Sequence, residues 1–267
     1  MKITNFAKLK QKRLIVFDLD GTLVLTKSLM DSEMDRLVSK LLEEKRVAII
    51  GGGKYGVFQS LFLRQLTAPK DLLQNLFLFP TTSTSFYKYN KGWKRVYVHA
   101  LSATERSKIK ATFNRVFQEI GYKHPKKTYG RIIEDRGTQV TFSVFGQDIV
   151  TALGKKGVAI KEKWKHEHTD TKMLIAKLMA KYLPNLEVHA AGYTSIDVTQ
   201  KGIDKAYGLR QIEKYLKVKI KDMVFVGDAI FPGGNDYAAV KTGVDYVPVV
   251  SIEDTKKVIR ALLNKTK

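Results

Sequence analysis

The sequence contains no cysteine among its 267 residues, which excludes disulfide bonds and thiolate metal ligands. It also has no uninterrupted apolar run near the roughly 18 to 20 residues that span a membrane. Residues 1–20 are basic but contain neither a clean hydrophobic h-region nor a small-residue cleavage site, so they do not match a secretory signal. We therefore expect a cytoplasmic protein without a membrane partner.

Acidic residues are scarce relative to basic ones: 26 Asp and Glu stand against 47 Lys and Arg, which gives a net charge of +21. A charge of this size raises the hypothesis of a protein that binds nucleic acid or an anionic surface. The lysines, however, are spread over the chain, in segments such as "KLKQKR", "HPKKTYG" and "KVKIKD", and they do not form one stripe interleaved with aromatic residues. A solvated surface explains this distribution, so we do not expect a nucleic-acid partner.

Short apolar runs that end in Gly or Asp, each followed by a helical pattern, occur near both ends of the chain. Three of them are "RLIVFDLDG", "RVAIIGGG" and "DMVFVGD". Their hydrophobicity is continuous rather than alternating, which is typical of strands buried on both faces. The pattern predicts an α/β fold with a doubly wound parallel sheet and helices on either side.

The middle of the chain has a different texture, because aromatic and polar residues alternate in "SFYKYN" and "RVYVHA" as they do in half-exposed antiparallel strands. A helix is predicted from Ser102, a candidate N-cap with Glu105 three residues later. Further strands are predicted within 130–146 and 186–202, with a helix over 170–184 between them.

These patterns predict two domains. We expect an α/β core domain formed by residues 1–81 and 196–267. An α+β domain of residues 82–195 is expected to be inserted between its halves.

Two carboxylates, Asp18 and Asp20, stand one residue apart where the first apolar run ends. In open α/β sheets, ligands gather at the carboxyl ends of the strands. A strand's period of two lets both carboxylates point to one side, and their repulsion is relieved by a cation or a shared proton. Mg²⁺ suits such oxygen ligands and commonly accompanies phosphate chemistry. An Asp-rich loop that caps the next helix, with Gly21 for its turn, is the simpler alternative.

The segment "FDLDGTL" resembles the signature of the haloacid dehalogenase superfamily of phosphotransferases. The resemblance implies that Asp18 attacks phosphorus and that Asp20 acts as general acid and base. "KGIDKAYGL" is similar to the superfamily's lysine motif, which makes Lys205 a catalytic and phosphate-binding residue. "VFVGDAIFPGGND" is similar to its acidic motif and assigns a metal-binding role to Asp228, with the support of the pair Asn235 and Asp236.

The inserted domain resembles the type IIB cap, and the motifs together resemble the phosphomannomutase group most closely. The resemblance implies a Mg²⁺ cofactor held by Asp18, Asp20 (through its backbone carbonyl) and Asp228. The second motif departs from the pattern, because Gly53 stands where the group has a serine. Backbone N–H groups of Gly52 and Gly53, with Lys54 and Lys205, are then expected to bind the phosphate. A plain tight turn is the alternative for the glycines.

The resemblance assigns substrate binding to Lys27, which replaces an arginine just after the first motif, and to Arg136, Ser195 and Asp197 in the cap. Gln147 and Gly154 stand where phosphomannomutases carry further arginines, and a neutral amide is a poor anchor for a second phosphate. Arg131, Lys155 and Lys156 are candidates to compensate.

We therefore expect a Mg²⁺-dependent phosphatase that hydrolyses a small phosphorylated metabolite through an aspartyl-phosphate. A sugar phosphate is the leading candidate for this substrate. The alternative is a phosphomannomutase. The non-enzyme alternative is an anion or nucleic-acid binding protein built on the same scaffold.

Overall fold

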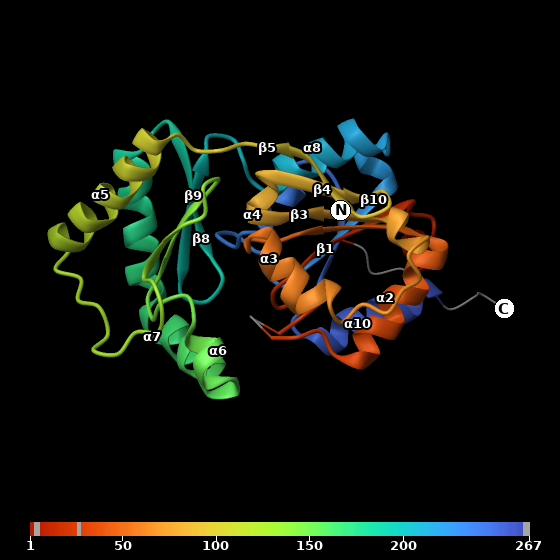
Figure 1. Cartoon of the computed structure of the whole chain (residues 1–267), viewed down its shortest axis with the longest axis horizontal. Coiled ribbons are helices and arrows are strands. Elements are labelled where there is room, and N and C mark those ends of the chain that lie inside the picture. Colours follow the sequence, from red (N-terminus) through yellow and green to blue (C-terminus); the bar gives the residue numbers. More distant parts are fainter. Residues whose placement is uncertain (3–5, 26–27, 264–267) are drawn as a thin grey trace. The chain divides into compact units, whose positions relative to one another are not determined.

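The computed structural model describes residues 1–2, 6–25 and 28–263, which divide into two compact units (Figure 1). The first unit comprises residues 1–98 and 204–267, and the second comprises residues 99–203. None of the helices in the described ranges has the length and apolar character needed to cross a bilayer.

The first unit is built on a seven-stranded sheet with the order β11-β10-β1-β2-β3-β4-β5. Strand β1 lies between β10 and β2 and pairs in parallel with both. The parallel part continues through β11 and β3, whereas β4 and β5 add an antiparallel edge. The strands span Leu14–Asp18 (β1), Arg46–Ile50 (β2), Leu76–Phe79 (β3), Ser85–Tyr89 (β4), Trp93–Val98 (β5), Met223–Gly227 (β10) and Asp245–Pro248 (β11).

Helices cover both faces of this sheet, because successive strand residues point to opposite sides. Ile15 and Phe17 pack in the cluster that includes α2 and α10, whereas Leu14 and Val16 pack in the cluster that includes α8. The predicted doubly wound fold is therefore confirmed. The helical segments are α1 (Phe6–Lys10), α2 (Ser32–Glu44), α3 (Tyr55–Phe58), the π-helical η1 (Gln59–Leu63), the 3₁₀ segments η2 (Leu72–Asn75) and η3 (Ile220–Asp222), α4 (Pro80–Ser83), α8 (Lys205–Leu216), α9 (Tyr237–Val240) and α10 (Ile252–Leu263).

The second unit has a four-stranded antiparallel sheet with the order β6-β7-β9-β8, formed by Ile133–Asp135 (β6), Val140–Ser143 (β7), Leu186–Ala191 (β8) and Ser195–Gln200 (β9). One face packs its apolar side chains against the helices α5 (Ala103–Glu119) and α7 (Lys155–Tyr182). A short helix, α6 (Ile149–Leu153), precedes α7. The N-cap of α5 is Ser102, and its capping box with Glu105 is confirmed.

Both expected domain boundaries differ from those of the structure. Residues 82–98 belong to the first unit, because β4 and β5 extend its sheet by pairing with β3. Residues 196–203 belong to the second unit, because β9 lies between β7 and β8. The helix predicted over 170–184 is also longer than expected, since α7 begins at Lys155 and includes a non-helical residue at His168.

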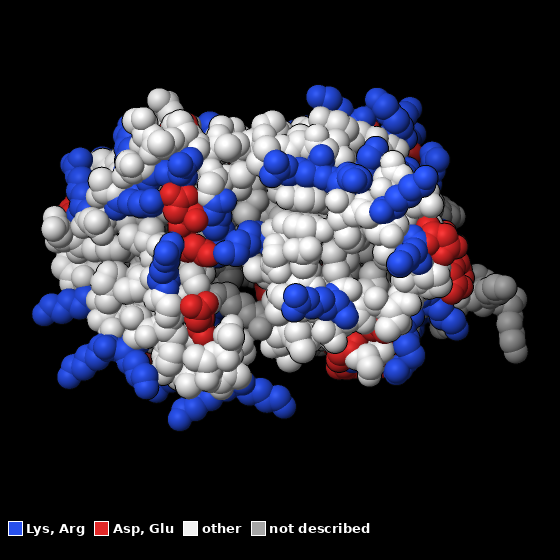
Figure 2. Space-filling view, viewed as in Figure 1, with Lys and Arg blue, Asp and Glu red and all other residues white. Residues whose placement is uncertain are grey.

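Basic side chains are scattered over the surface. On the face drawn in Figure 2, Lys and Arg occur on both units, and the acidic side chains gather in small groups among them. The view is in keeping with a solvated basic surface.

The capping box of α5 gives a test of local stability in the second unit. We expect Ser102→Ala to lower the unfolding free energy by about 1 kcal/mol, because an N-terminal amide of the helix loses its acceptor. Trp164 lies in the core of this unit, so its fluorescence during urea unfolding, in a Trp93→Phe background, reports on it.

The matched control is Ser107→Ala at an exposed position in the second turn of the same helix. Alanine is the better helix former there, so stability should rise by about 0.5 kcal/mol. Equal destabilisation by both variants would contradict the capping role.

Candidate active site

A buried lysine joins two aspartates at the carboxyl edge of the first unit's sheet. Asp18 is the last residue of β1, and Lys205 is the first residue of α8. The Lys205 Nζ donates to Asp18 Oδ1 at 2.6 Å and also to Asp236 Oδ1. Asp236 Oδ2 accepts from the backbone N–H of Ala229 at 3.0 Å. Lys205 is 1% exposed, so these ion pairs are shielded from water.

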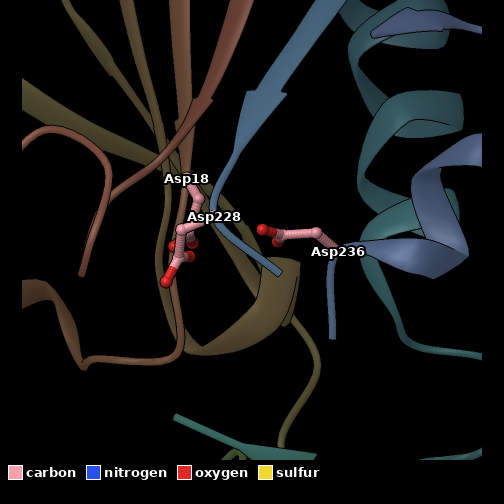
Figure 3. A group of neighbouring side chains, drawn as sticks. All are labelled: Asp18, Asp228 and Asp236. Atoms are coloured by element: carbon pink, nitrogen blue, oxygen red, sulfur yellow. The ribbon is translucent and has the colours of Figure 1, made fainter. Parts of the chain in front are cut away.

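Asp228 follows β10 directly and completes a group of three carboxylates. One oxygen from each of Asp18, Asp228 and Asp236 lies within 4.8 Å of the others. Figure 3 shows the carboxylate of Asp236 directed toward those of Asp18 and Asp228. The structure thus brings Asp236, expected only in a supporting role, into the centre of the cluster. Its neighbour Asn235 lies in the same turn.

Two glycines allow the carboxylates to approach so closely. Gly21 has a φ of +86°, and a Cβ there would lie 2.5 Å from Asp228 Oδ2. A Cβ at Gly227 would overlap the carboxylate of Asp236. Both positions therefore need glycine for steric reasons, and Gly21 also needs it for its left-handed backbone.

The electrostatics of the cluster are dominated by burial. Burial raises the pKa of Asp18 well above its usual range, with Lys205 opposing the shift and Asp236 and Asp228 adding to it. Burial also raises the pKa of Asp228 to about 6, with a further contribution from Asp236. Lys205 is disfavoured as a cation by burial, but Asp18 and Asp236 outweigh this and raise its pKa. One ammonium therefore does not balance three carboxylates.

Asp20 lies beside this group rather than within it. Its backbone forms a bridge with Val24, and its charge contributes to the raised pKa of Asp228, which places the two carboxylates within electrostatic range. Its side chain is half-buried and is not one of the three clustered carboxylates.

The glycine loop after β2 is held by the segment that follows β3. The N–H of Thr81 donates to Gly53 O, and that of Thr82 to Gly51 O, both at 2.9 Å. Gly52 and Gly53 are half-buried and Lys54 is exposed. A Cβ at Gly53 would lie 2.9 Å from Val57 Cγ1. A serine at position 53 would therefore require the side chain of Val57 to shift.

A separate polar face lies on the sheet of the second unit. Arg136, in the turn after β6, donates from Nε to Glu134 Oε2 at 2.7 Å and from Nη2 to Gln147 Oε1 at 3.1 Å. The side chain of Arg136 is 9% exposed. Gln147 therefore accepts a hydrogen bond from this guanidinium at a position where the resemblance places a further arginine.

A row of polar residues crosses all four strands on this face. Glu134 is paired with Thr141, Thr141 with Asp197, and Asp197 with His189. Direct cross-strand partners lie on the same side of a sheet. Of this row, only Asp197 is marked as a substrate residue by the sequence motifs. The alternation of polar and apolar residues along each strand could have indicated the others, but not their register.

The structure places the other cap positions named in the sequence at the ends of elements. Ser195 opens β9 opposite Ser143 and Ala191. Gly154 has a φ of +54° before α7, and Lys155 begins that helix. Lys27 lies outside the described residues.

The three carboxylates fit a hard divalent cation. They offer only oxygen ligands, which Mg²⁺ prefers. Burial and mutual repulsion raise the pKa of Asp18 and of Asp228, and Lys205 alone does not offset this.

Comparison with known sequences points to one family. The model of the family described as "Eukaryotic phosphomannomutase" matches residues 34–265. The phosphomannomutase of Saccharomyces cerevisiae is 28% identical over 269 residues, which cover 99% of this chain and 100% of the yeast protein. The phosphomannomutase of Drosophila melanogaster is 26% identical over 88% of this chain and 89% of its own length.

Solved structures of low sequence identity share the fold. IMP-nucleotidase of Plasmodium falciparum superposes with a TM-score of 0.70 at 17% identity, over 97% of this chain and 71% of that one. Trehalose-6-phosphate phosphatase of Aspergillus fumigatus gives a TM-score of 0.54 at 16% identity, over 99% of both chains.

The raised pKa of Asp228 predicts a loss of stability with rising pH in metal-free protein. Between its unfolded value of 3.8 and its folded value of about 6, the native state binds more protons than the unfolded chain, so stability falls as pH rises. A shift of about two units corresponds to about 3 kcal/mol. Urea unfolding in EDTA from pH 4 to pH 7 measures this loss.

Asp228→Asn is the control, because the amide does not titrate. As pH rises, the unfolding free energy of the variant should increase relative to that of the wild type. At pH 7, saturating Mg²⁺ should appreciably stabilise only the wild type. A constant difference between the two proteins across this range would contradict the assignment.

Proposed function

The chain belongs to the eukaryotic phosphomannomutase family of the haloacid dehalogenase superfamily, and on this premise we propose that it is a hexose-phosphate mutase that works through an aspartyl-phosphate. The observation that carries the proposal is the buried Lys205 that bridges Asp18 and Asp236 beside Asp228. Family membership supports an enzyme that acts on phosphorylated sugars. The phosphatase expected from the sequence is the second candidate.

In the first half-reaction, a carboxylate oxygen of Asp18 attacks the phosphorus, and the bond between phosphorus and the sugar oxygen breaks. Asp20 gives a proton to the leaving oxygen. In the second half-reaction, a sugar hydroxyl attacks the phosphorus of phosphorylated Asp18 while Asp20 takes up its proton. The bond between phosphorus and the Asp18 oxygen breaks, which restores the carboxylate. Lys205 places a positive charge next to Asp18 throughout.

Asp18 must be ionised to attack, yet burial and its acidic neighbours favour its protonated form. Lys205 supplies part of the compensation. Asp18 and Asp228, with the backbone carbonyl of Asp20, would hold Mg²⁺, and Asp236 would hold Lys205 in place. When bound, Mg²⁺ supplies the charge that offsets repulsion between the carboxylate and an anionic phosphate.

The second unit carries side chains suited to binding a sugar phosphate. Arg136 offers a guanidinium for a phosphate, and Ser195 and Asp197 offer hydrogen bonds for sugar hydroxyls. In the glycine loop, backbone N–H groups of Gly52 and Gly53, with the charge of Lys54, would contact the transferring phosphate.

One observation favours the second candidate, a phosphatase. Arg136 is engaged by both Glu134 and Gln147, and Gln147 adds no charge for a second phosphate. With a weaker anchor, water rather than a sugar hydroxyl would discharge the phosphorylated Asp18.

The nucleophile is tested by Asp18→Asn. The amide cannot attack phosphorus, so turnover of mannose 1-phosphate, in the presence of a sugar bisphosphate and Mg²⁺, should fall by about three orders of magnitude or more. Asp71→Asn, at an exposed carboxylate, serves as the control and should retain wild-type turnover. Full activity of Asp18→Asn would sink the mechanism.

The choice between mutase and phosphatase is tested at Gln147. Wild-type protein should form mannose 6-phosphate faster than it releases inorganic phosphate when both products are followed in one reaction. Gln147→Arg should raise the ratio of isomer to phosphate about tenfold, because an arginine adds a charged hydrogen bond to the second phosphate.

Gln118→Arg is the matched control, since it adds the same charge at an exposed position of α5. It should leave the product ratio at the wild-type value. Phosphate release that far outpaces isomer formation in the wild type would favour the phosphatase.

A further inference from the structure

Asp197 is a buried carboxylate held by a directed chain of hydrogen bonds. Thr141 Oγ1 donates to Asp197 Oδ1 at 2.8 Å, and Gln139 Nε2 donates to Thr141 Oγ1 at 2.9 Å. Gln139 and Thr141 are 0% and 2% exposed, and Asp197 is 3% exposed. The hydroxyl has a single proton and an ionised carboxylate can only accept, so the direction of the chain is fixed.

The hairpin turn between β6 and β7 places the first member of this chain. The N–H of Arg136 donates to Gln139 O at 2.8 Å, and Gly137 between them has a φ of +78°. Gln139 directly precedes β7 and Thr141 lies within it, two residues later. Their side chains therefore point to the same face of the sheet. The same turn therefore supports both Arg136 and the donor to Thr141.

Charged groups surround Asp197 on this face. Burial raises the pKa of Asp197; the charges of Arg136 and His189 and the hydrogen bond from Thr141 oppose the rise, whereas Glu134 adds to it. His189 is fixed on β8 by a contact of 3.1 Å from its Nε2 to Ile203 O. A buried carboxylate without such support would take up a proton or destabilise the fold.

We propose that Gln139 and Thr141 are positioning residues, which hold Asp197 ionised so that its carboxylate accepts hydrogen bonds from the hydroxyl groups of the substrate. A carboxylate accepts about four hydrogen bonds, and among the described residues Thr141 supplies one. The capacity left over suits a polyhydroxylated phosphate ester rather than an aryl or alkyl phosphate. This inference rests on the proposed function and defines how its substrate class is selected.

The first test needs no activity. With ¹³C-labelled aspartate, and with Asp197→Asn to assign the signal, the carboxyl resonance of Asp197 is titrated by NMR. Thr141→Val should shift its titration to higher pH, because the ionised form loses its donor. Thr199→Val is the matched control, since Thr199 Oγ1 is also buried on β9 but donates to Ile203 O. Identical titrations of wild type and Thr141→Val would overturn the proposal.

The second test measures selectivity with two probes, mannose 1-phosphate and p-nitrophenyl phosphate. Thr141→Val should lower the ratio of their kcat/KM values about tenfold, chiefly through KM for the sugar phosphate, because a charge-assisted hydrogen bond is lost. The acid limb of kcat/KM for mannose 1-phosphate should move to higher pH. Thr141→Ser should restore both, and Thr199→Val should retain the wild-type ratio.

Gln139→Leu keeps the Thr141 hydroxyl and should change both readouts in the same direction by a smaller factor, so it replaces Thr141→Val if that variant does not fold. An unchanged ratio with an unchanged acid limb would overturn the role in selectivity. A wild-type protein that turns over neither probe with Mg²⁺ would count against the proposed function. The NMR titration would still decide whether the hydrogen-bond chain from Gln139 through Thr141 controls the pKa of Asp197.

Discussion

The ion pairs of Lys205 are the interaction on which the first unit's site depends. They connect the end of β1, the start of α8 and the turn before α9, three segments that are distant in sequence. Removing one partner of a buried pair leaves an uncompensated charge, which costs roughly 3 to 5 kcal/mol. The lysine and its aspartates therefore hold one another in place, and the small glycines around them follow from the closeness of the carboxylates.

The balance of charge around the buried carboxylates differs between the two units. Three carboxylates face one ammonium in the first unit. Burial and mutual repulsion raise the pKa of Asp18 and of Asp228, so the cluster favours the binding of further positive charge. In the second unit, Asp197 has a hydroxyl donor, and the guanidinium of Arg136 opposes the rise of its pKa on burial. The proposed function assigns chemistry on phosphorus to the first polar group and binding of sugar hydroxyl groups to the second.

Strand-end motifs made much of the first site predictable, since Asp18, Asp228 and Lys205 are marked by local sequence. Features that depend on the pairing of strands could not be predicted from local sequence. Alternation in residues 85–98 indicated antiparallel strands correctly, but it carries no information on which sheet they join. The register that aligns Thr141 with Asp197 is likewise a property of the folded sheet. The start of α7 was missed because few apolar residues mark a helical face in its first half.

In the proposed mechanism, Asp18 carries the phosphoryl group. The most direct measurement is to quench wild-type protein during turnover of mannose 1-phosphate with Mg²⁺, reduce it with borodeuteride and map the peptides by mass spectrometry. Reduction converts an aspartyl-phosphate to deuterated homoserine, which the account predicts at position 18. Label at Asp20, Asp228 or Asp236, or an unlabelled position 18 in a protein that is turning over, would contradict it.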